Sequence, residues 1–177
     1  MKAERMTSPS HPLYARAMEL YRDSFPAHEL REEPSQTEIL SNPAYHFDLI
    51  FDGDEFVGEV LYWETAGFFY IEHFCILPEM RNRHYGQRAL ELLHDTPLIL
   101  EIDPPVDDIS VRRKGFYERC GFVENPYRHI HPPYHRNNKG HDLVVMSRPR
   151  MLTQAEYDAF YACLRDVVMK DAWKPLS

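Results

Sequence analysis

Apolar residues recur at helical spacing in the first part of the chain, after Pro12, a residue suited to the first turn of a helix. The pattern predicts an amphipathic helix between Pro12 and Pro26. A second, shorter helix is expected from Ser35-Gln36-Thr37-Glu38, which has the form of a capping box, to a position near Pro43.

The spacing changes to strand type after Pro43. An antiparallel meander of three strands is expected, at 47–51, 56–63 and 68–76, with turns at Gly53-Asp54 and Ala66-Gly67. Residues 86–94 have a helical apolar face, and 98–102 read as a short buried strand. This succession of strand, helix and strand implies a parallel crossover.

The remaining segments complete an α/β pattern. Asp107 or Asp108 caps a helix that Gly121 ends, and a strand begins at Phe122. Residues 125–140 show no period and are expected to form a long surface loop. A final strand follows at 143–146, and a capping box at Thr153 opens a helix whose apolar stripe includes Phe160, Leu164 and Val167.

We therefore expect a mixed, mostly antiparallel sheet of six or seven strands, flanked by helices. The length is that of one domain, 1–177, with a core at about 13–148 and a helical extension at 150–177. The extension packs across the sheet or against a second copy of the chain, which leaves a homodimer open.

Composition narrows the choice of partners. The chain has 20 Lys and Arg against 28 Asp and Glu, a net charge of −8, which disfavours nucleic acid. It has no apolar run of the roughly 18 residues that a membrane span needs, and its first residues lack the apolar stretch of a secretory signal. We expect a cytoplasmic protein with no membrane partner. Three widely spaced cysteines fit buried free thiols better than disulfides or a metal knuckle.

A local basic cluster stands out in this acidic chain and predicts a small anionic ligand. Its members are Arg81, Arg83, Arg88, Arg112, Arg113, Lys114 and Arg119. The first three lie between a predicted strand and a predicted helix, where unpaired backbone N–H groups and the helix dipole favour an anion such as pyrophosphate. The alternative is an ordinary solvated turn.

Two motifs resemble those of the GNAT acetyltransferase superfamily. Arg81-Asn82-Arg83-His84-Tyr85-Gly86 is similar to its pyrophosphate loop, with His84 where the first Gly is usual. Phe116 to Phe122 is similar to its late FYxxxGF signature, about thirty residues further on. The resemblance covers Leu13 to about Ser147. Tyr70 to Phe74 and Pro132-Pro133-Tyr134 resemble a bacterial subgroup whose acceptors are not known.

The resemblance implies transfer of an acetyl group from acetyl-CoA to a primary amine, by direct attack in a ternary complex. It places the pantetheine and the acetyl carbonyl along a splayed strand at Cys75, Ile76 and Leu77. The implied cofactor site also includes Arg81, Arg83, His84, Tyr85, Gly86, Gln87 and Arg88. The competing function is an acyl-CoA sensor without turnover, and the presence of Glu72 and Tyr117 favours the enzyme.

The chemistry needs a base for the ammonium proton and an acid for the departing thiolate. Tyr117 matches the family's acid, and the alternative is an aromatic core residue. Glu72 is the candidate base, and the alternative is a carboxylate that fixes a neighbour or binds the substrate's charge. His73 is the rival base. Strand alternation places Glu72 and His73 on opposite faces, so only one of them is expected to face the substrate.

The acceptor is expected to contact Glu29, Arg31, Tyr62, His73 and Tyr134. Together with Glu72, the carboxylate of Glu29 and the aromatic faces of Tyr62 and Tyr134 favour a small cationic amine. A metal site at His129, His131 and His135 is the weaker alternative, because this spacing brings no obligatory fourth ligand. Cys75 as an acyl-accepting nucleophile lacks an assignable His and Asp.

Overall fold

The computed structural model describes residues 1–93 and 95–172, and it is built on an eight-stranded sheet with the order β1-β2-β3-β4-β5-β8-β6, in which β7 also pairs with β8. All the pairs are antiparallel except β4 with β5. The strands are β1 (Lys2–Arg5), β2 (Tyr45–Asp52), β3 (Glu55–Glu64), β4 (Phe69–Ile76), β5 (Leu98–Ile102), β6 (Val123–Glu124), β7 (His129–His131) and β8 (His141–Arg148). The predicted mixed, mostly antiparallel sheet and its parallel crossover are confirmed.

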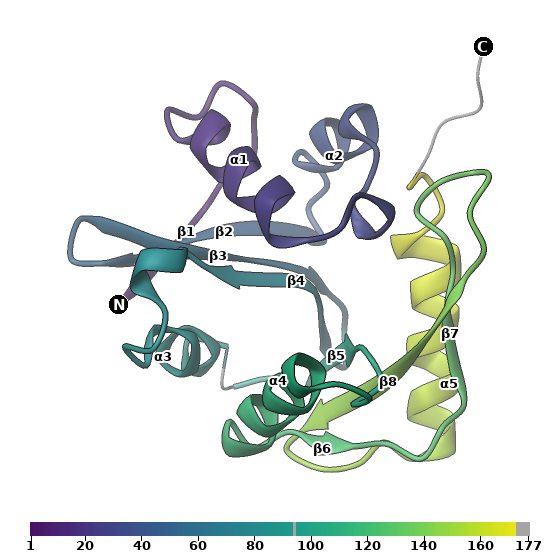
Figure 1. The fold of residues 1–177 in the computed structure, drawn as a ribbon. Helices are drawn as coiled ribbons and strands as arrows, with labels where there is room; N and C mark the ends of the chain where they lie inside the picture. Colours follow the sequence, from purple (N-terminus) through teal and green to yellow (C-terminus); the bar gives the residue numbers. More distant parts are fainter. Residues whose placement is uncertain (94, 173–177) are drawn as a thin grey trace.

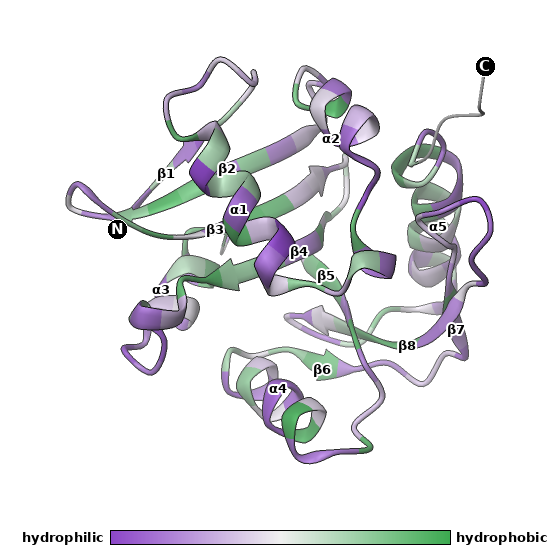
Figure 2. Cartoon of the chain, turned by 45° about the horizontal axis from the view of Figure 1, so that its top comes forward, coloured by the Kyte–Doolittle hydropathy of each residue, from purple (hydrophilic) through white to green (hydrophobic). Residues whose placement is uncertain are grey.

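Helices cover both faces of this sheet (Figure 1). The helices are α1 (Tyr14–Ser24), α2 (Glu33–Ile39), α3 (Tyr85–Glu91), α4 (Asp108–Arg119) and α5 (Gln154–Cys163), with 3₁₀ turns at Ala27–Glu29 and Pro78–Met80. Helices α1 and α2 lie on one side of the meander, α3 and α4 lie on the other, and α5 stands beside β7 and β8 (Figure 1). Hydrophobic residues follow the central strands, whereas the connection from β7 to β8 is hydrophilic (Figure 2).

Two strands and one helix start differ from the sequence predictions. The edge strand β1 was not expected, and β7 lies inside the segment that was predicted to be a surface loop. Helix α2 begins at Glu33, so Ser35 is not a cap. Instead, Ser35 is buried inside the helix and its hydroxyl bonds to the Asp171 carbonyl, because the C-terminal segment packs against α2.

The C-terminal helix packs on its own chain. Its predicted capping box at Thr153 is present, and Phe160 is buried 5.2 Å from the ring of Tyr70 on β4. A π-helical turn, Leu164–Val168, follows it, in which the Met169 N–H bonds to the Leu164 carbonyl five residues back. The wider turn breaks the helical spacing, so Val167 is exposed rather than part of the predicted apolar stripe. Within the described residues, no helix has the length and apolarity needed to cross a membrane.

Candidate active site

Strands β4 and β5 separate after a short paired stretch and leave a space between them. Their parallel register is Phe69 with Leu98, Tyr70 with Ile99 and Ile71 with Leu100. Beyond Ile71, both strands border a cavity of about 840 Å³. Its walls include residues 70–76 of β4 and 100–103 at the end of β5. Because these strand edges face the cavity rather than each other, their backbone groups can bond to a ligand.

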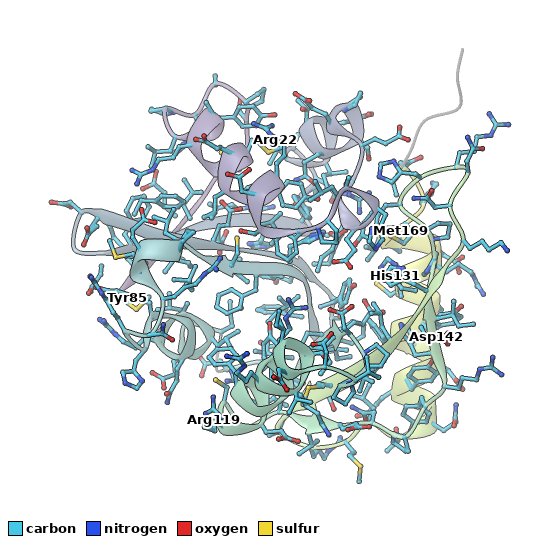
Figure 3. All side chains as sticks on the ribbon, viewed as in Figure 1. Arg22, Tyr85, Arg119, His131, Asp142 and Met169 are labelled. Carbon is cyan, nitrogen blue, oxygen red and sulfur yellow. The ribbon has the colours of Figure 1, made fainter. Side chains whose placement is uncertain are left out.

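One end of the cavity is formed by the basic turn and the start of α3. The lining residues at this end are Met80, Arg81, Asn82, His84, Tyr85, Gly86, Gln87, Phe116, Tyr117, Arg119 and Cys120. Figure 3 shows Tyr85 and Arg119 on this side of the molecule and His131 on the opposite side.

The backbone of the basic turn is left-handed at two positions. His84, which stands where the family's Gly is usual, has φ of 61°, and Asn82 has φ of 62°. This left-handed region favours Gly, so His84 adopts it at a cost of about 1–2 kcal/mol. Gly86 lies against α4, since a Cβ built on it would be 3.0 Å from the Phe116 ring.

Three members of the predicted cofactor set do not line this cavity. Arg88 forms a bidentate ion pair with Asp52, at 3.0 and 3.2 Å, and its guanidinium lies over the Tyr85 ring. The Arg83 guanidinium lies 3.8 Å from the Met80 sulfur. Leu77 is buried in the core, and its N–H donates to the Val57 carbonyl. Cys75 and Ile76 do line the cavity, and burial raises the pKa of the Cys75 thiol, which disfavours a nucleophilic thiolate.

Tyr117 faces the cavity from α4. Its ring packs at 5.1 Å from that of Phe116 and 5.6 Å from that of Phe122. Burial raises the pKa of its phenol to about 12. The group therefore stays protonated at neutral pH and can donate a proton to an alkyl thiolate, while its ring also belongs to the core.

Glu72 is buried and fully engaged. A β-bulge sets Tyr62 opposite Ile71 and Leu61 opposite His73, so that Glu72 has no partner across the β3–β4 ladder. Its carboxylate accepts bonds from Arg31 Nη2 at 2.9 Å, Tyr134 OH at 3.0 Å and Trp63 Nε1 at 2.7 Å. Burial opposes ionisation, but Arg31, His73 and the Trp63 N–H outweigh it and hold the pKa of Glu72 below its usual value.

The bulge also overturns the expectation that only one of Glu72 and His73 faces the substrate side. Both residues line the cavity. His73 Nε2 bonds to the Glu29 carbonyl at 3.0 Å, and its ring packs against those of Tyr21 and Phe25 at 4.9 and 4.7 Å. Burial lowers the pKa of His73 and keeps the imidazole neutral.

The predicted acceptor residues divide into two groups. Glu29 and Tyr134 line the cavity with His73. Arg31 is buried behind this wall, where it holds Glu72 and also donates to the Val168 carbonyl at 2.8 Å. Tyr62 points elsewhere: it donates to Asp48 at 3.2 Å, and its ring stacks on that of His46.

The segment 125–140 was predicted to be a surface loop, but four of its residues are buried: Asn125, His129, His131 and Tyr134. The last three lie around Glu101 of β5, a cavity residue that the sequence analysis missed. His129 Nε2 and Tyr70 OH both bond to the Glu101 carboxylate, and His131 Nε2 lies 3.7 Å from it. Burial opposes ionisation of Glu101, but His131, His129 and Tyr70 hold its pKa below the usual value. The only signal for this network was Glu101 within an apolar strand.

Within the described residues, no group of three or more His, Cys, Asp or Glu side chains could hold a metal ion. The imidazoles of His129 and His131 instead face one carboxylate, and His135 bonds to the Ala27 carbonyl at 2.9 Å. The metal alternative therefore has no support from these side chains.

The sequence model of the acetyltransferase (GNAT) family matches residues 13–122. The chain belongs to the GNAT acetyltransferase family. As a GNAT acetyltransferase it transfers an acetyl group from acetyl-CoA. A structure assigned to the same family, from Bacteroides thetaiotaomicron, is similar with 30% identity and a TM-score of 0.90, over 98% of this chain and 100% of the other.

Two less similar acetyltransferase structures share the fold. An aminoglycoside 6'-N-acetyltransferase from Enterococcus faecium is 15% identical with a TM-score of 0.56, over 84% of this chain and 96% of the other. The ribosomal-protein-S18-alanine N-acetyltransferase from Escherichia coli is 16% identical with a TM-score of 0.56, over 86% and 96% of the two chains. No curated protein sequence matches the chain.

Proposed function

We propose that this GNAT enzyme acetylates the primary amine of a small cationic molecule by direct attack on acetyl-CoA in a ternary complex. The single observation that carries the proposal is the continuous cavity, which joins the basic turn at one end to a carboxylate-rich end at the other. A cofactor and an acceptor can therefore meet between β4 and β5 without a covalent enzyme intermediate.

The cofactor end fits a pyrophosphate. The backbone N–H groups at the start of α3 lie in the cavity wall with Arg81 and Gln87. Arg83 and Arg88 lie outside this wall and contribute to the field around the entrance. The thioester then lies along Cys75 and Ile76, and the Tyr117 phenol is the proposed donor of a proton to the departing thiolate.

The acceptor end fits a cation. Glu29 and Glu101 face the cavity with the ring of Tyr134. Burial, aided by the charge of Asp103, raises the pKa of Glu29, and a bound ammonium would stabilise its ionised form. For Glu72, the three hydrogen bonds favour the second alternative, a carboxylate that fixes its neighbours. Tyr62 and Arg31 are proposed to act only by supporting this wall.

Acetyl-CoA is expected to bind at the basic turn, with an affinity that falls at high salt because charges attract the pyrophosphate. Gly86→Val should weaken binding about tenfold or more, because its side chain would press on Phe116 and overpacking costs about 1–3 kcal/mol. Isothermal titration calorimetry measures both effects. Gly67→Val is the matched control, since nothing lies within 4 Å of a Cβ there. Equal affinities in the two variants would move the site away from α3.

The acceptor class is tested by measuring the release of free CoA over a panel of small primary amines, polyamines, amino acids, aminoglycosides and peptides. We expect turnover with a small cationic amine. Turnover confined to peptides would contradict the proposed acceptor class. Tight acetyl-CoA binding with no CoA release on any amine would instead support the sensor.

A further inference from the structure

We propose that His131 is the base that takes the proton from the acceptor's ammonium group. This inference rests on the proposed function, because it concerns the same cavity and the same amine. His131 belongs to β7, outside both motifs that identify the family, and it lines the acceptor end of the cavity.

The hydrogen bonds of His131 leave one nitrogen free to accept a proton. Nδ1 lies 2.5 Å from the Pro132 carbonyl, and since a carbonyl oxygen can only accept, this contact assigns the hydrogen to Nδ1. Nε2 then carries a lone pair. It is buried and has no hydrogen-bond partner in the described part of the chain. Buried polar atoms are normally paired, so this nitrogen is available to a ligand.

The surroundings of Nε2 favour a cation. The Glu101 carboxylate on β5 lies 3.7 Å away, a separation that one ammonium nitrogen can span with one N–H to each group. Tyr134 covers the ring from the β7–β8 connection, with centroids 5.0 Å apart. The other titratable groups around His131 are His141 of β8, with its ring at 5.5 Å, Glu29 of the turn after α1, and His73 of β4. The imidazolium that forms is thus stabilised by nearby carboxylates.

Three other titratable residues of the cavity wall, Glu72, Glu101 and His73, are already occupied or poorly placed. Glu72 accepts three hydrogen bonds, one of them from the Arg31 cation. Glu101 accepts from His129 and Tyr70. Both carboxylates have pKa values held below their usual range, which weakens them as bases. His73 lies between the rings of Tyr21 and Phe25, and burial lowers its pKa.

The amine nitrogen loses two protons during the reaction. The ammonium gives one proton to His131 Nε2 and becomes the neutral amine, which forms a bond to the carbonyl carbon of the thioester. The carbon–sulfur bond breaks, and the second proton lost by nitrogen ends on the thiolate through Tyr117. The products are the amide, free CoA and a protonated His131 that later releases its proton to solvent.

The test is the pH dependence of kcat/KM in His131→Asn, with the best amine of the panel. Asn keeps a donor near the Pro132 carbonyl but removes Nε2. We expect kcat/KM to fall by about 10²-fold or more, and the decline at acid pH that reports imidazole protonation to disappear. Acetyl-CoA affinity should be unchanged. In His131→Ala, added imidazole should restore part of the rate by occupying the space left by the ring.

His28→Asn is the matched control, because this imidazole is more than half exposed and outside the cavity wall, and it should behave like the parent. A parent-like pH profile in His131→Asn overturns the inference. An equal loss at every pH, without rescue by imidazole, also overturns it, since it shows a structural role only. If the parent acetylates no amine, the proposed function fails first and this inference falls with it.

Discussion

Tyr117→Phe is expected to lower the rate of acetyl transfer by about 10²–10⁴-fold while leaving acetyl-CoA affinity nearly intact, because the variant loses a proton donor that acts in the transition state. The ring stays, so its contacts with Phe116 and Phe122 are preserved. Folding stability should therefore change little. The raised pKa of Tyr117, about 12, keeps the phenol protonated through the whole range in which the enzyme can be assayed.

Single-turnover kinetics measure this effect, because they separate the chemical step from the release of products. Tyr14→Phe is the matched control. The Tyr14 hydroxyl on α1 bonds to that of Thr37 at 3.1 Å, and Tyr14 does not line the cavity, so loss of this hydroxyl should leave the rate unchanged. A single-turnover rate in Tyr117→Phe equal to that of the parent would return Tyr117 to a purely structural role in the core.

Elements with strong periodicity or caps were predictable from the sequence. The meander β2–β4, the buried strand β5 and the helix capped by Asp107 all lie where the pattern placed them. Strand β1 was missed because Lys2–Arg5 carries no apolar alternation, which is common at the edge of a sheet.

Strand β7 was missed for a different reason, since its pattern of burial is the inverse of its hydropathy. Ile130 is 42% exposed, whereas His129 and His131 on either side of it are buried, with only 2% of each residue exposed. Because strands are predicted from alternating apolar residues, such a segment is predicted to be a loop. His129 points inward because Glu101, a buried carboxylate on β5, needs a hydrogen-bond donor, and this long-range requirement is invisible in the local sequence.

The two ends of the site also differ in how far the sequence could predict them. The cofactor end depends on a contiguous motif, so its turn and helix start could be predicted, although not the outward pairing of Arg88 with Asp52. The acceptor end is assembled from the turn after α1, from β4, β5 and β7, and from the β7–β8 connection. Its geometry depends on a bulge that brings Glu72 and His73 to one cavity, and a period of two cannot anticipate a bulge.

Glu72→Gln is expected to destabilise the fold by about 3–5 kcal/mol, because it leaves the guanidinium of Arg31 buried without its counter-charge. Both side chains are almost completely buried, at 0% and 1% exposure. The carboxylate uses one oxygen for Arg31 and Tyr134 and the other for Trp63, and all three partners are donors. A glutamine has only one oxygen, so its amide N–H₂ must face at least one of these donors.

Urea denaturation measures the loss, and Glu64→Gln is the matched control. Glu64 pairs with His46, but its side chain is 52% exposed, so the same substitution there should cost no more than about 1 kcal/mol. Adding Arg31→Met to Glu72→Gln should cost less than the sum of the single effects, because the second change removes the unpaired charge that the first one leaves. A Glu72→Gln protein as stable as Glu64→Gln would show that the pair is not needed.

The pH dependence of stability follows from the same pair. The pKa of Glu72 is lower in the folded protein than in the unfolded chain. Its ionised form therefore contributes fully to the free energy of unfolding at any pH above the unfolded-state pKa, and this contribution is lost as the pH falls through about 4 and below. The lowered pKa of His73 acts in the same direction at higher pH, since the unfolded chain takes up a proton near 6.5 that the buried ring resists. The parent should therefore lose stability in two stages on acidification. Glu72→Gln should keep the first stage, which comes from His73. It should lose Glu72's share of the second stage, because a glutamine side chain does not take up a proton in this pH range.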